Sequence, residues 1–285
     1  MQKIWVCGAR GQIGQAVNDV VDKLEFEMLD TDVDDLDVTD TDEVLRFGEM
    51  NRPDIIINCS GMTDISSCEE NPSQAFKVNA LGARNLAIVA AKMQAKMVQL
   101  STDDVFDGKS TEPYTEFDIT NPGTVYGKSK LAGENYVKEF TTKHFIVRST
   151  WVYGKGQNFI NGFLKKVDAG EQLLIASDQF GSPTSANELA RFLLHLVHTS
   201  EYGTYHATNK GVCSRYAFAQ KILKMTGKTA SMQPVPTVMS DFSKVRPAYA
   251  VLDNFIMSMV PIYDFPDWQD SLREYLEERG LYHAE

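Results

Sequence analysis

The first half of the chain alternates short apolar runs with longer amphipathic stretches. The apolar runs occupy residues 3–7, 26–30, 54–59, 97–101 and 144–149. Helical periodicity lies between them, at residues 12–23, 41–51, 72–93 and 124–140. Short runs that are apolar throughout are typical of strands covered on both faces. Strands that alternate with helices predict an α/β fold with a Rossmann-type, doubly wound parallel sheet.

The pattern is looser after residue 150. Helical periodicity is found at residues 158–169, 186–199, 214–226 and 267–279, and short β-like pieces at 171–175 and 203–207. Five prolines between residues 234 and 266 indicate a loop-rich final third. We therefore expect residues 1–150 to form a dinucleotide-binding domain and residues 151–285 to form mainly a smaller substrate-binding lobe. The two would be packed together, with the ligand cleft between them.

Charge and cysteine content narrow the class of protein. The net charge of −11 disfavours a nucleic-acid partner, because a phosphate backbone would be repelled over most of the surface. The four cysteines form no CxxC pair and have no metal-ligand spacing with the five histidines, so we expect reduced thiols and no metal. The first residues contain no signal segment and the chain has no membrane-length apolar run. A cytoplasmic protein without a membrane partner is expected.

A glycine-rich turn directly follows the first apolar run. The sequence GARGQIG at residues 8–14 places Gly8, Gly11 and Gly14 between a strand and a helix, with Arg10, Gln12 and Ile13 beside them. Glycines there allow a tight turn and close approach of the backbone to a pyrophosphate, which the amides at the helix start can bind. The turn therefore predicts a nicotinamide dinucleotide site.

Acidic residues after the second apolar run bear on the choice of cofactor. Asp30 ends that run, where a carboxylate can accept hydrogen bonds from the adenosine ribose and disfavour a 2′-phosphate. A loop cap is the alternative role for Asp30. Asp37 and Val38 could meet the adenine, although a solvated Asp37 is an equal alternative. Arg10 could instead bind a 2′-phosphate, so NADH is favoured and NADPH is not excluded.

Further polar residues follow the third apolar run. Cys59, Ser60 and Gly61 lie at its carboxyl end, where ligands bind in doubly wound sheets. We expect them to line the path of the cofactor. Asn79, in the helical stretch that comes next, is expected to hold backbone or water near the same site.

The candidate catalytic residues come from two neighbouring segments. Tyr126 and Lys130 are four residues apart on a predicted helix, so phenol and ammonium share one face. The cation would stabilise the phenolate and could also bind the nicotinamide ribose, so both residues are candidate cofactor contacts as well. Thr102 and Asp103 end the fourth apolar run, where the Thr102 hydroxyl can polarise a substrate carbonyl.

Taken together, these motifs resemble those of the extended short-chain dehydrogenase/reductases, and within them the dTDP-4-dehydrorhamnose reductases. The resemblance spans nearly the whole chain, through residues 8–14, 101–108, 126–134, 148–154 and 178–184. It implies Thr102, Tyr126 and Lys130 as the catalytic residues. It also implies a C-terminal substrate lobe in which the residues holding a sugar nucleotide would be Trp151, Asn158, Gln179 and Arg246. Arg246 has a reason of its own, since a guanidinium fork suits a diphosphate.

Some positions depart from the pattern of that family. Asp104 stands where the family usually has Tyr, Ser66 where it has Asp, and Ala250 where it has Ser. Gly123-Thr124 replaces a Leu-Asn or Leu-Ser pair. Ala16 replaces a Glu that some members use in a metal-bridged dimer, so no such metal is expected. The catalytic trio is intact while positions near the pocket differ, so the reaction type is better defined than the substrate.

Three functions are consistent with these residues. The first is an NAD(P)H-dependent reductase of a nucleotide-linked 4-keto-6-deoxy sugar, with Tyr126 as proton donor. The second is the same chemistry on another carbonyl substrate. The third is a regulatory subunit that binds the dinucleotide without turnover, against which the intact Thr102, Tyr126 and Lys130 argue. The sequence leaves the oligomeric state open, a homodimer included.

Overall fold

The computed structural model describes residues 1–239 and 247–283. At its centre is a parallel sheet of six strands in the order β10-β5-β4-β3-β1-β2. The strands are β1 (Gln2–Cys7), β2 (Phe26–Thr31), β3 (Ile55–Asn58), β4 (Lys96–Thr102), β5 (His144–Ser149) and β10 (Gly203–His206). Strand order reverses between β1 and β3, which is where such sheets bind a ligand. The expected α/β fold with a doubly wound sheet is confirmed.

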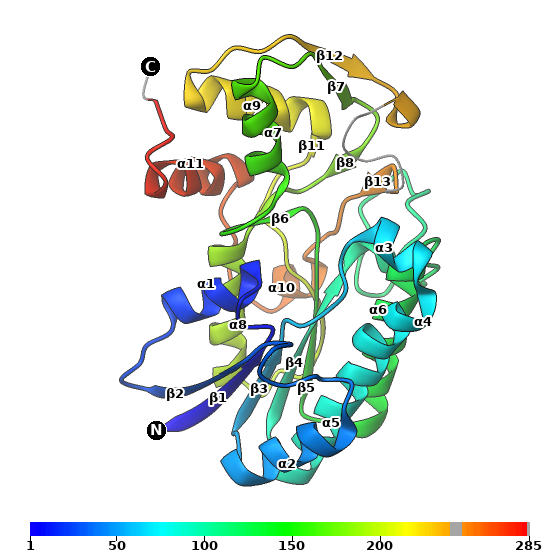
Figure 1. The fold of residues 1–285 in the computed structure, drawn as a ribbon, viewed down its shortest axis with the longest axis vertical. Coiled ribbons are helices and arrows are strands. Elements are labelled where there is room, and N and C mark those ends of the chain that lie inside the picture. Colours follow the sequence, from blue (N-terminus) through cyan, green and yellow to red (C-terminus); the bar gives the residue numbers. More distant parts are fainter. Residues whose placement is uncertain (240–246, 284–285) are drawn as a thin grey trace.

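Helices cover both faces of this sheet (Figure 1). One face packs on α1 (Gln12–Val20) and α8 (Ala186–His198), and the other on α2 (Thr41–Asn51), α5 (Ala83–Met93) and α6 (Val125–Phe140). Successive residues of β1 alternate between the two layers: Ile4 and Val6 belong to the first core cluster, and Trp5 and Cys7 to the second. Burial on both faces explains why the strands are apolar throughout rather than alternating.

A smaller lobe lies beyond the carboxyl ends of the strands (Figure 1, top). It contains α7 (Phe159–Asp168), α9 (Arg215–Thr226), α11 (Trp268–Glu278) and the parallel pair β7 (Leu173–Ala176) and β12 (Met232–Val235). These elements share an apolar core of their own that includes Phe163, Phe218 and Leu272. Short strands connect the layers: β6 (Val152–Tyr153) pairs with β9 (Thr184–Ser185), and β8 (Phe180–Gly181) with β11 (Cys213–Ser214) and β13 (Tyr249–Ala250).

The chain returns to the large sheet after entering the lobe. The helix predicted at 186–199 is α8, which packs on α1, and the β-like piece at 203–207 is β10, the sixth strand of the sheet. Both lie beyond residue 150, so the sheet layer draws on both halves of the sequence. The division into two domains at that position remains a prediction.

Local departures concentrate near the carboxyl edge of the sheet. The helix expected at 72–93 is three pieces: α4 (Pro72–Phe76), a π-helical segment (Lys77–Gly82) and α5. Two short helices were not expected, α3 (Ile65–Glu70) and α10 (Phe255–Met259). These helices have only six and five residues, too few to produce a clear apolar period in the sequence.

Candidate active site

The glycine turn between β1 and α1 has no room for side chains. A Cβ on Gly8, whose φ is +75°, would lie 2.7 Å from the backbone nitrogen of Ser60. A Cβ on Gly14 would lie 2.4 Å from the carbonyl oxygen of Gly8. Gly11 precedes α1 and offers no side chain to cap its first-turn amides. Bare backbone beside a helix start suits the pyrophosphate of a dinucleotide.

A cavity of about 510 Å³, here the cofactor cavity, opens beside this turn. Eight of the expected cofactor residues line it: Gly8, Arg10, Gly11, Asp37, Val38, Cys59, Ser60 and Gly61. Gly14 lies behind the turn rather than on the cavity wall. The size and the donor-rich glycine wall fit the adenosine and pyrophosphate parts of a nicotinamide dinucleotide.

The carboxylate at the ribose side of the cofactor cavity differs from the expected one. Strand β2 continues past Asp30 to Thr31, and Asp30 is exposed and does not line the cavity. Thr31 faces the core, where its hydroxyl accepts a hydrogen bond from Trp5 Nε1 at 2.8 Å. Asp32 lines the cavity and accepts from the backbone amide of Arg10 at 2.9 Å. Of these two carboxylates Asp32 lies at the cavity, and the ribose contact expected of Asp30 stays a prediction.

Arg10 is held at the cofactor cavity by two further acids. Its guanidinium forms ion pairs with Asp34 at 2.8 Å and Asp35 at 2.9 Å. All three side chains are largely solvent-exposed, so each pair contributes little to stability. The contacts nevertheless neutralise the one arginine that lines this cavity among the residues described.

Asn79 acts on the site through the loop after β3. It lies in the π-helical segment, and its Oδ1 accepts from the amide of Met62 at 2.8 Å while its Nδ2 donates to the Met62 carbonyl at 2.9 Å. Nδ2 also donates to Ser129 Oγ at 2.9 Å, on α6. Asn79 therefore joins the loop after β3 to α6, the helix that contains Tyr126, and it does not line the cofactor cavity. This placement agrees with the expectation that Asn79 holds backbone near the site.

Tyr126 and Thr102 are brought together by a close contact between backbones. Thr102 is the last residue of β4, and Tyr126 lies in the first turn of α6, which Thr124 caps by accepting from the amide of Gly127 at 2.9 Å. A Cβ on Gly127 would lie 2.0 Å from the carbonyl oxygen of Asp104. The start of α6 can therefore lie directly against the turn after β4, so that both side chains line the same cavity.

Lys130 follows Tyr126 by one helical turn and is buried in the same wall. Burial lowers the pKa of Lys130 to about 8, while the nearby charges of Glu134 and Cys59 act in the opposite sense. A lysine in this range is a cation at neutral pH and loses its charge just above it. Lys130 is thus suited to stabilise a phenolate on the same helix face.

A buried ionic network supports this catalytic wall from behind. Glu134, one turn beyond Lys130, accepts from Arg148 of β5 through Nε at 2.9 Å and Nη2 at 2.7 Å. The hydroxyl of Ser101, next to Thr102, donates to Glu134 at 2.6 Å. Burial alone would raise the pKa of Glu134, yet its bonds to Arg148 and Ser101 hold that pKa below its ordinary value. A carboxylate that the sequence analysis did not single out therefore ties α6 to β4 and β5.

A second cavity of about 510 Å³, here the catalytic cavity, contains the candidate catalytic residues. The expected site residues that line it are Gly11, Gln12, Ile13, Cys59, Ser60, Gly61, Thr102, Asp103, Tyr126, Lys130, Trp151 and Asn158. Gly11, Cys59, Ser60 and Gly61 also line the cofactor cavity, so the two spaces are adjacent. A dinucleotide bound along the glycine turn would reach from one into the other.

The lobe end of the catalytic cavity is formed by Trp151 and a residue the sequence analysis missed. Trp151 has a φ of +47°, in the left-handed region, and its ring lies against Gly181, where a Cβ would approach to 2.6 Å. The guanidinium of Arg215 stacks 3.4 Å from the Trp151 ring centroid. Arg215 belongs to no sequence motif, and only the fold brings it to this cavity from α9.

The other expected substrate residues differ in their placement. Asn158 lines the catalytic cavity, but it also caps α7 by accepting from Asn161 N at 3.0 Å, and it donates to the Gly154 carbonyl at 2.7 Å. Gln179 is buried and is not part of the cavity wall. Its backbone carbonyl accepts a hydrogen bond from the backbone amide of Arg215 at 3.0 Å. Arg246 lies outside the described residues.

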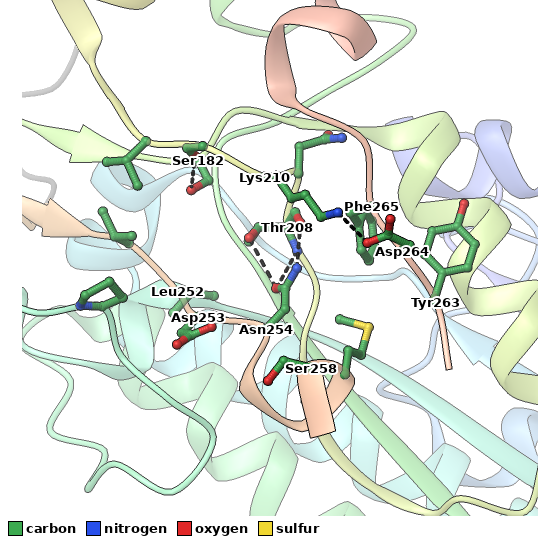
Figure 2. A pocket seen from close by; sticks show the side chains of 16 residues that line it. Ser182, Thr208, Lys210, Leu252, Asp253, Asn254, Ser258, Tyr263, Asp264 and Phe265 are labelled. Carbon is green, nitrogen blue, oxygen red and sulfur yellow. Dashed lines mark hydrogen bonds and ion pairs between the residues drawn. The ribbon is translucent and has the colours of Figure 1, made fainter. Parts of the chain in front are cut away.

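A third cavity, of about 410 Å³, lies apart from these motifs (Figure 2). Its polar side chains bond to one another or to backbone: Lys210 pairs with Asp264, and Thr208 and its amide donate to Asn254 Oδ1. Ser182 donates to the Gly211 carbonyl at 2.8 Å. These contacts join the segment after β10 to the start of α10 and to the segment before α11, so the cavity belongs to a structural junction.

The described residues contain neither a cluster of metal-ligating side chains nor a membrane-length apolar helix. Residues 1–239 and 247–283 contain no group of three or more His, Cys, Asp or Glu placed to hold a metal ion. In the same part of the chain no helix combines the length and apolarity needed to span a bilayer.

Comparison with known proteins agrees with this geometry. Residues 1–280 match the family model described as the RmlD substrate binding domain. The chain is 35% identical over 281 residues to the spore coat polysaccharide biosynthesis protein SpsK of Bacillus subtilis, covering 98% of this chain and 99% of that protein.

Two solved structures are similar throughout. A dTDP-4-dehydrorhamnose reductase from Clostridium acetobutylicum superposes with a TM-score of 0.95 at 40% identity, covering 98% of this chain and 100% of that one. The Bacillus anthracis dTDP-4-dehydrorhamnose reductase, solved in complex with NADP, gives a TM-score of 0.94 at 35% identity, covering 98% and 99%. These findings confirm the resemblance and the expectation of an NAD(P)-dependent oxidoreductase. The chain belongs to the RmlD substrate binding domain family.

Proposed function

We propose that the protein is an NAD(P)H-dependent reductase of a nucleotide-linked 4-keto-6-deoxy sugar, with Tyr126 as its proton donor. The observation that carries the proposal is that Thr102, Tyr126 and Lys130 line one cavity, adjacent to the cofactor cavity and closed on the other side by the lobe. The names of the similar reductases support a dTDP-linked sugar as the substrate class.

Each side chain has a defined part in this reaction. A bound dinucleotide would supply hydride to the keto carbon. The Tyr126 phenol donates its proton to the oxygen of that carbon, and the Thr102 hydroxyl polarises the same carbonyl by hydrogen bonding. Lys130, as a cation, stabilises the phenolate that Tyr126 leaves. Glu134, paired with Arg148, holds the Ser101 hydroxyl beside Thr102, and its charge favours the cationic form of Lys130.

Both dinucleotides are proposed as cofactors, with NADH used at least as well as NADPH. Asp32 at the cofactor cavity would accept from the ribose hydroxyls and repel a 2′-phosphate. The ion pairs of Arg10 with Asp34 and Asp35 weaken the cation that would attract that phosphate.

The test is oxidation of NADH and NADPH with a panel of nucleotide-linked ketosugars and simpler carbonyl compounds. The proposal expects turnover with dTDP-4-keto-6-deoxy sugars and little with carbonyls that lack the nucleotide. Turnover confined to the simpler carbonyls would favour another substrate class. Tight dinucleotide binding with no turnover on any substrate would favour a regulatory subunit.

A further inference from the structure

Arg215 is a buried cation in the wall of the catalytic cavity. It is the first residue of α9, and only 6% of its surface is exposed. Lys130 belongs to α6, and Arg215 belongs to α9; Figure 1 shows α6 against the sheet and α9 in the lobe. Both residues line the catalytic cavity. The guanidinium is therefore desolvated at the end of the cavity where a substrate would extend away from the catalytic residues.

Aromatic rings pack against this guanidinium. It lies 3.4 Å from the ring centroid of Trp151 and 4.8 Å from that of Phe159. An aromatic face suits Arg because its delocalised charge is weakly hydrated. The backbone is also fixed, since Ser214 caps α9 through the amide of Ala217 at 3.1 Å.

The charges on this cavity are few and unevenly placed. Among the described residues that line it, Lys130 and Arg215 are the cations and Asp103 is the carboxylate. Lys130 is committed to the phenol of Tyr126 in the proposed reaction. A protein with a net charge of −11 needs a local cation to hold an anionic substrate.

We propose that Arg215 binds a phosphate of the substrate's nucleoside diphosphate, on the platform made by Trp151, and so selects for nucleotide-linked sugars. This inference rests on the proposed function, because it takes the anion from that substrate class. A buried guanidinium fork matches a phosphate with two parallel hydrogen bonds and binds it more tightly than a solvated lysine would.

The test is calorimetric titration of the purified full chain with dTDP and, separately, with NADH. Arg215→Gln removes the charge but keeps most of the side-chain length, and it should weaken dTDP binding about 10- to 100-fold. Arg215→Lys keeps the charge without the planar fork and should fall between wild type and Arg215→Gln. NADH affinity should stay within about twofold in both variants, since the cofactor residues are untouched.

Arg273→Ala is the matched control. Arg273 is an exposed residue of α11 that pairs with Asp270, and its replacement lowers the net charge by the same amount. An equal loss of dTDP affinity in this control, or loss of NADH binding along with dTDP binding in Arg215→Gln, would overturn the inference. Wild-type affinity for dTDP in both Arg215 variants would overturn it while leaving the proposed function standing. No binding of dTDP by the wild type would overturn both.

Discussion

The two ends of the active site are built in different ways. At the cofactor end, seven consecutive residues form the turn, and the important contacts are between backbone atoms, as at Gly8 and Ser60. At the lobe end, the wall comes from segments far apart in the chain, such as Trp151, Asn158 and Arg215, and the contacts are between side chains.

This difference determines which positions of the site can accept other residues. Backbone that binds a pyrophosphate tolerates no added Cβ, so the cofactor end is restricted to glycine at fixed positions. Side chains at the lobe end are under no such backbone restriction. We therefore expect the chemistry to depend on the sheet layer and the substrate choice on the lobe.

The largest effect is expected from Tyr126→Phe, at the boundary between the two ends. Loss of the phenol proton should lower kcat by about 10²- to 10⁴-fold, because proton transfer is a chemical step that water performs poorly in a closed site. The ring still packs, so NADH affinity should change little. Steady-state rates and NADH fluorescence titration measure both quantities. Near-normal turnover would remove Tyr126 from the proton-donor role.

Gly14→Ala tests the backbone character of the cofactor end. The new Cβ would lie 2.4 Å from the carbonyl oxygen of Gly8, so the turn must shift. We expect NADH affinity to fall about 10- to 100-fold, in line with the 1–3 kcal/mol typical of overpacking. Gly162→Ala in α7 is the control, since no atom lies within 4 Å of its Cβ position. Unchanged NADH affinity in Gly14→Ala would contradict the close-packed turn.

The pH dependence of the reduction rate tests the role of Lys130, which lies between the two ends of the site. The pKa of Lys130 is about 8, so its stabilising charge is present below that pH and is lost as the pH rises through it. The rate of carbonyl reduction, as kcat/KM, should therefore decline above pH 8.

Glu134→Gln removes a charge that raises the pKa of Lys130, so this decline should move to lower pH. The variant should also be less stable, because Arg148 loses its buried counter-charge. Ser101→Ala is the milder control: it removes a hydrogen bond to Glu134 but keeps the carboxylate. If Glu134→Gln and the wild type have the same pH profile, the decline in kcat/KM is not caused by deprotonation of Lys130.

The smallest effect is expected at the rim of the cofactor cavity. Asp32→Ala should shift the ratio of kcat/KM for NADH and NADPH towards NADPH by roughly tenfold, the value of one charge contact of about 1.4 kcal/mol. Asp30→Ala should leave the ratio unchanged, since Asp30 is exposed and outside the cavity wall. The opposite pattern in the two variants would return the ribose contact to Asp30.

The sequence predicts the main helices and strands of both layers well, but it predicts the side-chain contacts of the lobe poorly, for a physical reason. Strand, turn and helix follow one another at residues 2–20, so local patterns specify the glycine turn. The same holds for Tyr126 and Lys130, which share one helix face. Strand β2 runs one residue beyond Asp30, and Asp32 rather than Asp30 lines the cofactor cavity, so the ribose contact of either carboxylate stays a prediction.

Contacts between distant segments carry no such local signal. Arg215 meets Trp151 only after β6, α7 and α9 have packed, and Glu134 meets Arg148 only after α6 has docked on β5. A buried arginine and a buried glutamate in amphipathic helices have the same sequence pattern as solvated ones. Arg215 lies in none of the sequence motifs, and Glu134 lies in one whose pattern does not reveal its buried contact.

The most direct test of the account follows a hydrogen atom from one end of the site to the other. The protein would be incubated with dTDP-4-dehydrorhamnose and NADH carrying deuterium at the transferable position of its nicotinamide, and the sugar product analysed by mass spectrometry and NMR. We predict a reduced sugar nucleotide that carries one deuterium at the former keto carbon, formed by Tyr126→Phe at least about 10²-fold more slowly than by the wild type. Unreduced sugar nucleotide from the wild type, or deuterium at any other carbon, would contradict this prediction.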